Sequence, residues 1–208
     1  MAKYKLTSET KLWFGRTLYR IEALISFGSV KAGDKGGFVE AEKNLGQEGN
    51  AWVYGNAWVS GNALVYGNAR VSGDARVYGN ARVSGDAQVS GNARVYGDAQ
   101  VSGNAQVSGD ALVYGNAQVS GNALVYGNAQ VSGNALVYGN ALVYGNAQVS
   151  GNALVYGNAR VSGDAQVSPV NLILIGGRRG YSVTIIDQHM QIGCEFHKIT
   201  DWFDFDDR

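Results

Sequence analysis

The stretch Gly61-Asn62-Ala63-Leu64-Val65-Tyr66 is one of twenty consecutive copies of a six-residue unit, which run from Gly49 to Ser168 without a gap. The unit reads Gly, then Asn or Asp, Ala, a variable residue, Val, and Tyr or Ser. A short, strict period indicates one backbone shape repeated along the chain, with each repeat packed on its neighbours. The repeats cover more than half of the 208 residues and therefore decide the architecture.

Residue types alternate within each unit, as they do in a short β-strand. Successive side chains of a strand point to opposite faces, so Ala and Val share one face, and the variable residue shares the other with Tyr or Ser. Ala and Val never change within the repeats, which predicts that they form the interior. Gly, Asn and Asp accept the left-handed backbone region at low cost, so we expect them at the corners between strands.

The spacing of the aspartates predicts how many units close one coil. Asp replaces Asn at regular intervals in the first half of the repeats, at Asp74, Asp86, Asp98 and Asp110. Two units per coil would stack these carboxylates about 4.8 Å apart, where like charges repel. Three units per coil place no two Asp next to one another. The sequence therefore predicts a triangular, 18-residue coil made of three six-residue units.

The segment before the repeats, residues 1–48, is expected to cap the coil. Apolar and polar positions alternate there, which predicts short antiparallel strands. Val39 and Leu45 share the sequence phase of Ala51, so we expect a degenerate first coil to begin near Val30. A cap is needed because an uncovered coil end would expose backbone hydrogen-bonding groups.

The segment after the repeats, residues 169–208, is expected to cap the other end. It begins with Pro169, the only proline, whose missing N–H ends a strand ladder. Apolar runs at Asn171–Ile175, Tyr181–Ile186 and Met190–Phe196 predict a small β-hairpin unit, and Ile199–Phe205 predicts a short helix.

The repeat resembles the hexapeptide repeat of left-handed parallel β-helix proteins. The segment from Val30 to Val53 reads V-x-x-G-D-x-G-G-F-V-E, then N-L and G-N-A-W-V. It resembles the N-terminal region of enterobacterial hexapeptide-repeat proteins of the transferase-like type, and of related phage proteins. Residues 175–196 look like the small C-terminal domain of phage repeat proteins, but they carry only Cys194 where that domain has two cysteines. The resemblance implies a left-handed coil and a bacterial or phage origin.

Composition excludes several classes of partner. Seventeen basic and seventeen acidic residues leave no electrostatic footprint for nucleic acid or an anionic membrane. The apolar runs are too short to span a bilayer, and the N-terminus lacks an apolar stretch of the signal-peptide type. A single cysteine excludes an intrachain disulfide framework. We therefore expect a cytoplasmic protein with no nucleic-acid or membrane partner.

Catalytic and metal-binding residues are not apparent. Enzymes of the hexapeptide class, as the resemblance implies, use a His general base on the coil or on an inserted loop. The repeats contain no His and no inserted loop, and His189 and His197 lie in the C-terminal segment, where we interpret them as packing or surface residues. We expect no catalytic residue, no metal and no cofactor. An acyltransferase-like enzyme of the hexapeptide class stays the alternative.

A glycine-rich loop in the C-terminal segment holds two arginines. Arg178 and Arg179 lie within Gly176–Gly180, and their guanidinium groups suit a phosphate or carboxylate. The loop lacks the spacing of a phosphate-binding P-loop, so a plain hairpin turn is the alternative.

The outward positions of the repeats carry the remaining functional signal. A Leu at the variable position is always followed by Tyr two residues on, and a Gln by Ser. With three units per coil, Leu-Tyr pairs stack on two neighbouring faces. Contiguous apolar surface often marks an interface, although cross-strand packing spread by repeat duplication would give the same pattern. The eight residues concerned are Leu124, Tyr126, Leu142 and Tyr144 on one face, and Leu136, Tyr138, Leu154 and Tyr156 on the next.

The sequence favours a non-enzymatic structural or binding protein. We expect a rigid β-helix rod that forms a homo-oligomer, with a trimer as the first expectation by analogy with the fold. Its other partner would be a protein or a small ligand.

Overall fold

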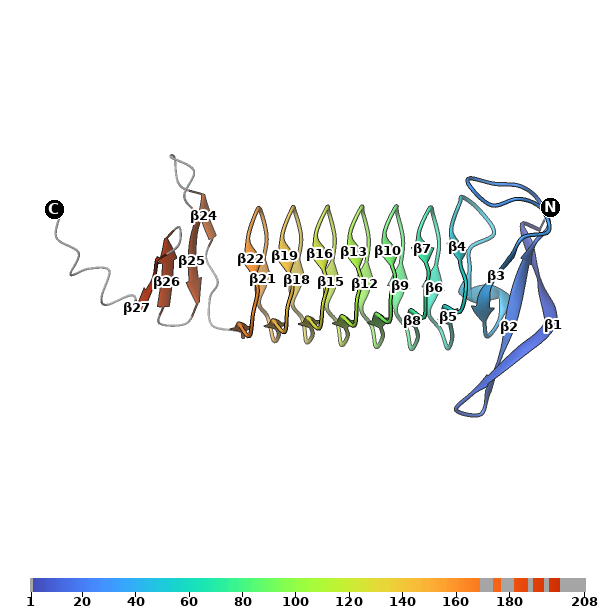
Figure 1. Cartoon of the computed structure of the whole chain (residues 1–208), viewed down its shortest axis with the longest axis horizontal. Helices are drawn as coiled ribbons and strands as arrows, with labels where there is room; N and C mark the ends of the chain where they lie inside the picture. Colours follow the sequence, from blue (N-terminus) through green and yellow to red (C-terminus); the bar gives the residue numbers. More distant parts are fainter. Residues whose placement is uncertain (1, 169–173, 177–181, 187–188, 193–194, 199–208) are drawn as a thin grey trace.

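The repeats form a parallel β-solenoid built from three sheets (Figure 1). The computed structural model describes residues 2–168 and four later strands, at 174–176, 182–186, 189–192 and 195–198. Each six-residue unit contributes one short strand, made of the variable residue and Val. The strands are β4 (Trp52–Val53), β5 (Trp58–Val59), β6 (Leu64–Val65), β7 (Arg70–Val71), β8 (Arg76–Val77), β9 (Arg82–Val83), β10 (Gln88–Val89), β11 (Arg94–Val95), β12 (Gln100–Val101), β13 (Gln106–Val107), β14 (Leu112–Val113), β15 (Gln118–Val119), β16 (Leu124–Val125), β17 (Gln130–Val131), β18 (Leu136–Val137), β19 (Leu142–Val143), β20 (Gln148–Val149), β21 (Leu154–Val155), β22 (Arg160–Val161) and β23 (Gln166–Val167).

Neighbouring coils are offset by three whole units, as the aspartate spacing predicts. Arg94 pairs in parallel with Leu112, and Val95 with Val113. The same offset recurs on all three sides, which we call the β4, β5 and β6 faces after their first solenoid strands. The predicted all-β solenoid with an 18-residue coil is therefore confirmed, and the part of the chain that the structure describes contains no α-helix.

Ala and Val fill the interior, which confirms the predicted inward face. The Ala and Val side chains of the central coils, such as Ala111 and Val113, are fully buried. Glycine forms each corner for two reasons. Gly103 has a φ of +66°, and a Cβ there would lie 2.9 Å from the backbone N of Gly121 in the next coil. A larger residue would therefore be both strained and too close.

The backbone hydrogen bonds between coils have a preferred direction. The N–H of Leu112 donates to the carbonyl of Ala129, that of Tyr114 to Val131, and that of Asn116 to Gly133, at 2.8–2.9 Å. Other units repeat this pattern, so the carbonyls of Gly, Ala and Val point toward the N-terminal end of the rod. The first coil consequently presents carbonyl oxygens that need donors.

A hairpin covers the N-terminal end and continues the β5 face. β1 (Tyr4–Trp13) pairs antiparallel with β2 (Arg16–Ala23), and β2 pairs antiparallel with β3 (Lys35–Val39). Because β3 pairs in parallel with β5, this sheet has ten strands in all. Figure 1 shows the hairpin extending sideways beyond the body of the solenoid at the N-terminal coils.

The degenerate first coil has a different phase from the one predicted. Val39 lies opposite Val59, and Leu45 opposite Val65, so both take the Val position and not the predicted Ala position. The offset between these partners is two residues longer than in the regular coils. A short 3₁₀ helix, η1 (Glu42–Asn44), precedes Leu45. Five residues then separate Leu45 from Ala51, where a regular corner has three, so this corner is wide.

Side chains of the N-terminal segment supply the donors that the first coil needs. The Lys3 Nζ donates to the carbonyl of Ala51 at 3.0 Å and lies 3.4 Å from that of Gly49. The Asn44 side-chain amide donates to the carbonyls of Gly61 and Ala63 at 3.1 and 2.9 Å. Lys3 is only 2% exposed, and this burial lowers its pKa to about 8.

The later strands form an antiparallel sheet. β24 (Leu174–Gly176), β25 (Ser182–Ile186), β26 (His189–Ile192) and β27 (Glu195–Lys198) pair in sequence order. The paired strands β26 and β27 divide between them the apolar run Met190–Phe196. Three features of the predicted C-terminal cap lie outside the described residues. They are Pro169, the first part of the apolar run Asn171–Ile175, and the helix predicted over Ile199–Phe205.

Candidate functional site

Eight outer side chains near the C-terminal end of the solenoid form what we call the Leu-Tyr patch. On the β4 face, Leu124 pairs with Leu142, and the rings of Tyr126 and Tyr144 stack with centroids 5.1 Å apart and planes 3° from parallel. The structure therefore brings these four predicted residues together. The other four predicted residues are arranged in the same way on the next face.

On the β6 face, Leu136 pairs with Leu154, and the rings of Tyr138 and Tyr156 stack at 5.3 Å. β18 of the β6 face leads directly into β19 of the β4 face through one corner, so the two halves of the patch adjoin along one edge of the rod. Tyr126, Tyr138 and Leu154 are 36–39% exposed, which leaves much apolar surface in contact with water.

The β5 face carries a longer row of aromatic rings. Tyr78, Tyr96 and Tyr114 stack with centroids 4.9 and 5.0 Å apart, in the order that the repeat predicts. The row continues toward the N-terminus through Trp58 and Trp13, whose centroids are 4.2 Å apart. Burial raises the pKa of the Tyr78 and Tyr96 hydroxyls above the ordinary tyrosine value.

Sequence reasoning missed the part that Trp13 plays in this row. Trp13 stands in the hairpin, outside the period, and its contact with Trp58 joins two residues far apart in the sequence. Leu18, Phe38 and Trp58 form a small core outside the solenoid, which Trp13 and Tyr78 flank. The signal in the sequence was Trp58 at an outward position of the repeat. Because a Trp side chain is large and apolar, it indicates that another segment covers this position.

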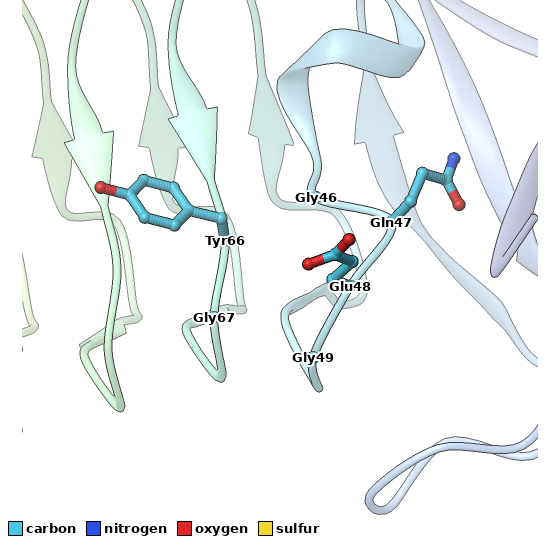
Figure 2. Close-up of a pocket in the computed structure, with 6 residues that line it drawn as sticks. All are labelled: Gly46, Gln47, Glu48, Gly49, Tyr66 and Gly67. Carbon is cyan, nitrogen blue, oxygen red and sulfur yellow. The ribbon is translucent and has the colours of Figure 1, made fainter.

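The wide corner after Leu45 produces an open notch (Figure 2). Gly46, Gln47, Glu48 and Gly49 line one side, and Tyr66 and Gly67 line the other, around a volume of about 570 Å³. Figure 2 shows the Tyr66 ring pointing toward the neighbouring coil, away from Glu48, so that the ring does not fill the gap.

A smaller hollow adjoins the notch. It measures about 250 Å³ and adds Lys43, Leu64 and Val65 to the lining. A Cβ on Gly46 would lie 3.1 Å from the Cβ of Tyr66, so a glycine lets the two segments approach closely. Sequence reasoning did not predict this notch, because it interpreted Leu45 in the phase of Ala51 and so saw no extra residues.

Several predicted features lie outside the described residues. Arg178, Arg179 and Cys194 are among them, and the side chains of His189 and His197 are not described. Within the residues that are described, no group of three His, Cys, Asp or Glu side chains is placed to hold a metal ion. No helix in the described part is long and apolar enough to cross a membrane.

A constant Ala and Val interior under a variable outer surface defines a parallel β-solenoid protein, and a family comparison agrees with this class. The chain belongs to the family whose model is described as YdcK Beta solenoid repeat, which matches more than half of it. A comparison with the curated proteins found no matching relative. The matched segments are residues 57–73, 63–77, 75–89, 87–103, 105–118, 117–133, 129–145, 137–151, 147–163 and 155–168.

Proposed function

We propose that the protein is a non-enzymatic structural or binding rod that self-associates through the Leu-Tyr patch. The observation that carries the proposal is the contiguous stacking of four Leu-Tyr pairs on two adjoining faces. A solenoid supplies a rigid support for such a surface, because every coil is hydrogen-bonded to the next. A trimer is the first expectation, by analogy with the fold.

The energetics favour the patch over the rest of the surface. Apolar area removed from water contributes about 25 cal/mol per Å², and Tyr can keep its hydroxyl at a polar rim. Several kcal/mol from the patch would offset part of the entropy lost on association. The Gln-Ser rows, such as Gln130 and Gln148 on the β5 face, offer little apolar area and should stay in water.

A fourfold variant tests the proposal. Changing Leu124, Leu136, Leu142 and Leu154 to Gln extends the stacking of Gln on Gln that the preceding coils of the same two faces already use, and leaves the Ala and Val core intact. We expect an unchanged circular dichroism spectrum and a lower mass by light scattering. A matched control changes Gln100, Gln118, Gln130 and Gln148 to Thr and should keep the mass of the wild type. A wild type with the mass of one chain, or a fourfold variant that keeps its assembly, would contradict the proposal.

An acyltransferase-like activity of the hexapeptide class is the second candidate, and the resemblance of the Val30–Val53 segment is what favours it. Calorimetric titration with acetyl-CoA tests it, because saturable binding would support an enzyme and no heat would favour the rod. The bacterial or phage origin and the cytoplasmic location belong to the same proposal, and they rest on the resemblance and on the sequence composition.

A further inference from the structure

The tip of the β1–β2 hairpin exposes two large apolar side chains. Leu12 is 74% exposed and Phe14 is 88% exposed, while Trp13 between them turns inward onto Trp58. We call Leu12 and Phe14 the knob. Phe14 also has a φ of +43°, the only positive φ of a non-glycine residue in the part of the chain that the structure describes. A strained, exposed Phe is costly for an isolated chain and points to a function at this site.

The notch beside Tyr66 has the complementary properties. Its walls are largely apolar, and Gly46 and Gly49, where an added Cβ would face Tyr66 and Gly67, place no side chain between its two sides. Tyr66 itself is 43% exposed. The notch and the adjoining hollow therefore offer an open site for apolar side chains on the surface of the rod.

Unpaired charges of opposite sign stand beside the two features, while the Nζ of Lys43 at the adjoining hollow donates a hydrogen bond to the Oδ1 of Asn62. Lys11 precedes the knob in β1, is exposed and forms no ion pair among the described residues, and its Nζ lies on the Trp13 side of the hairpin, 5.8 Å from the centroid of the Phe38 ring. Glu48 stands at the mouth of the notch, is exposed and also forms no ion pair within the described ranges. A Lys11 from one molecule can therefore pair with a Glu48 from another.

Both features lie near the N-terminal end of the rod, beside its first coils. The Trp13 ring beside the knob contacts Trp58 of the first regular coil and Tyr78 of the second, and the notch lies between Glu48 of the degenerate coil and Tyr66 of the first regular coil. We infer that the knob of one copy docks into the notch of a second copy, with the two rods side by side. Because knob and notch are different surfaces, the contact is heterologous, and with no axial offset and a rotation that closes it forms a ring and not a filament.

A mixing experiment tests this inference. The knob variant combines Leu12→Thr with Phe14→Asn, and Asn-Gly suits a hairpin turn with two positive φ values, so the hairpin should be at least as stable. The notch variant combines Leu64→Gln with Tyr66→Ser, a pair that other units of the chain already carry. Both are made in the fourfold Leu-to-Gln background, so that the Leu-Tyr patch contributes nothing to the measured mass.

We expect each variant alone to have the mass of one chain, and an equimolar mixture to form a pair. In the mixture the notch variant still has its knob and the knob variant still has its notch. One knob can therefore bind one notch, and this pairing requires a heterologous contact. The fourfold background without further changes should form the larger closed assembly. A background that is already a single chain, variants that keep its assembly, or a mixture that stays single would each overturn the inference.

Exchanging the charges of Lys11 and Glu48 gives an independent test of the docking of knob into notch, because both residues are exposed and the fold does not need them. Lys11→Glu and Glu48→Lys should each weaken association about tenfold at low salt, and the variant with both changes should recover it. Equal weakening in the single and double variants would show that these two residues do not meet. Failure of the Leu-Tyr patch to associate leaves this test unaffected, since the two contacts use different residues.

Discussion

The side-chain amide of Asn68 donates a 3.0 Å hydrogen bond to the carboxylate of Asp86, one coil further along the rod. The same bond joins Asn80 to Asp98 and Asn92 to Asp110. Elsewhere Asn donates to Asn at 3.0–3.2 Å, as from Asn134 to Asn152. An aspartate can accept in such a ladder but cannot donate, so each of these Asp residues is placed after an Asn.

Replacing the Asn68 donor by Asp should show how much a stack of two carboxylates lowers the stability of the fold. Asn68→Asp places two carboxylates in adjacent coils, whereas Asn134→Asp keeps an Asn on each side. Both variants lose one amide donor, so their difference reports the effect of the Asp86 charge, which is repulsion by the new carboxylate together with loss of a charge-assisted hydrogen bond. We expect Asn68→Asp to be less stable by about 0.5–1 kcal/mol at low salt, with the gap closing at high salt. Urea unfolding at two salt concentrations measures it, and equal stabilities would contradict the stacking.

The inward and outward positions should respond differently to the same charge. Val113→Asp buries an unpaired carboxylate and should cost more than about 3 kcal/mol, enough to prevent folding of the central coils. Gln118→Asp on the outer surface should change the stability by less than about 0.5 kcal/mol. Circular dichroism melting compares the two, and equal damage would mean that the observed in-and-out arrangement does not hold in solution.

Glycine corners should be sensitive to close approach as well as to backbone strain. Gly103→Ala meets both costs, because φ is +66° and the new Cβ lies 2.9 Å from the backbone of Gly121. Gly33→Ala, with a φ of +89° and nothing within 4 Å of the new Cβ, meets only the strain. We expect a loss of about 1–2 kcal/mol for Gly33→Ala and a larger loss for Gly103→Ala. If thermal unfolding ranked them the other way, coil-to-coil contact would not be what requires glycine.

Stability should depend on pH through Lys3. Its pKa is about 8 in the folded chain and 10.5 in the unfolded chain, so between these values the unfolded state binds more protons and stability rises with pH. Urea unfolding from about pH 7 to 9.5 should show a gain on the order of 1–2 kcal/mol. Tyr4 stays neutral in this range, because burial raises its pKa further. Lys3→Met should remove the slope, and a slope that persists would assign it to another group.

The regular coils could be predicted because their information is local and repeated. The aspartate spacing was enough to predict the number of units in a coil, and the invariant Ala and Val were enough to predict the residues of the core. The side-by-side stacking of Leu124 on Leu142 followed from the same period. The hand of the coil rests on the resemblance alone, and the role of the Leu-Tyr patch stays a prediction.

The N-terminal cap could not be predicted in the same way, because its contacts join residues far apart in the sequence. No periodicity links Lys3 to Ala51 or Trp13 to Trp58. The predicted phase of Leu45 was wrong because the two extra residues in the corner do not change the spacing of the apolar residues from which the phase was inferred. The notch, which depends on those two residues, was missed for the same reason.

The three-unit offset sets a fixed step by which this chain can change length. Gain or loss of three units inserts or removes a whole coil, and every later side chain keeps its face and its neighbours. Gain or loss of one unit instead turns all later residues onto the next face relative to the earlier ones, so such a change between Leu124 and Leu142 would separate these two stacked residues. Recombination between near-identical units can therefore lengthen or shorten the rod. Only a change by a multiple of three units keeps the stacked rows of outer side chains on their faces.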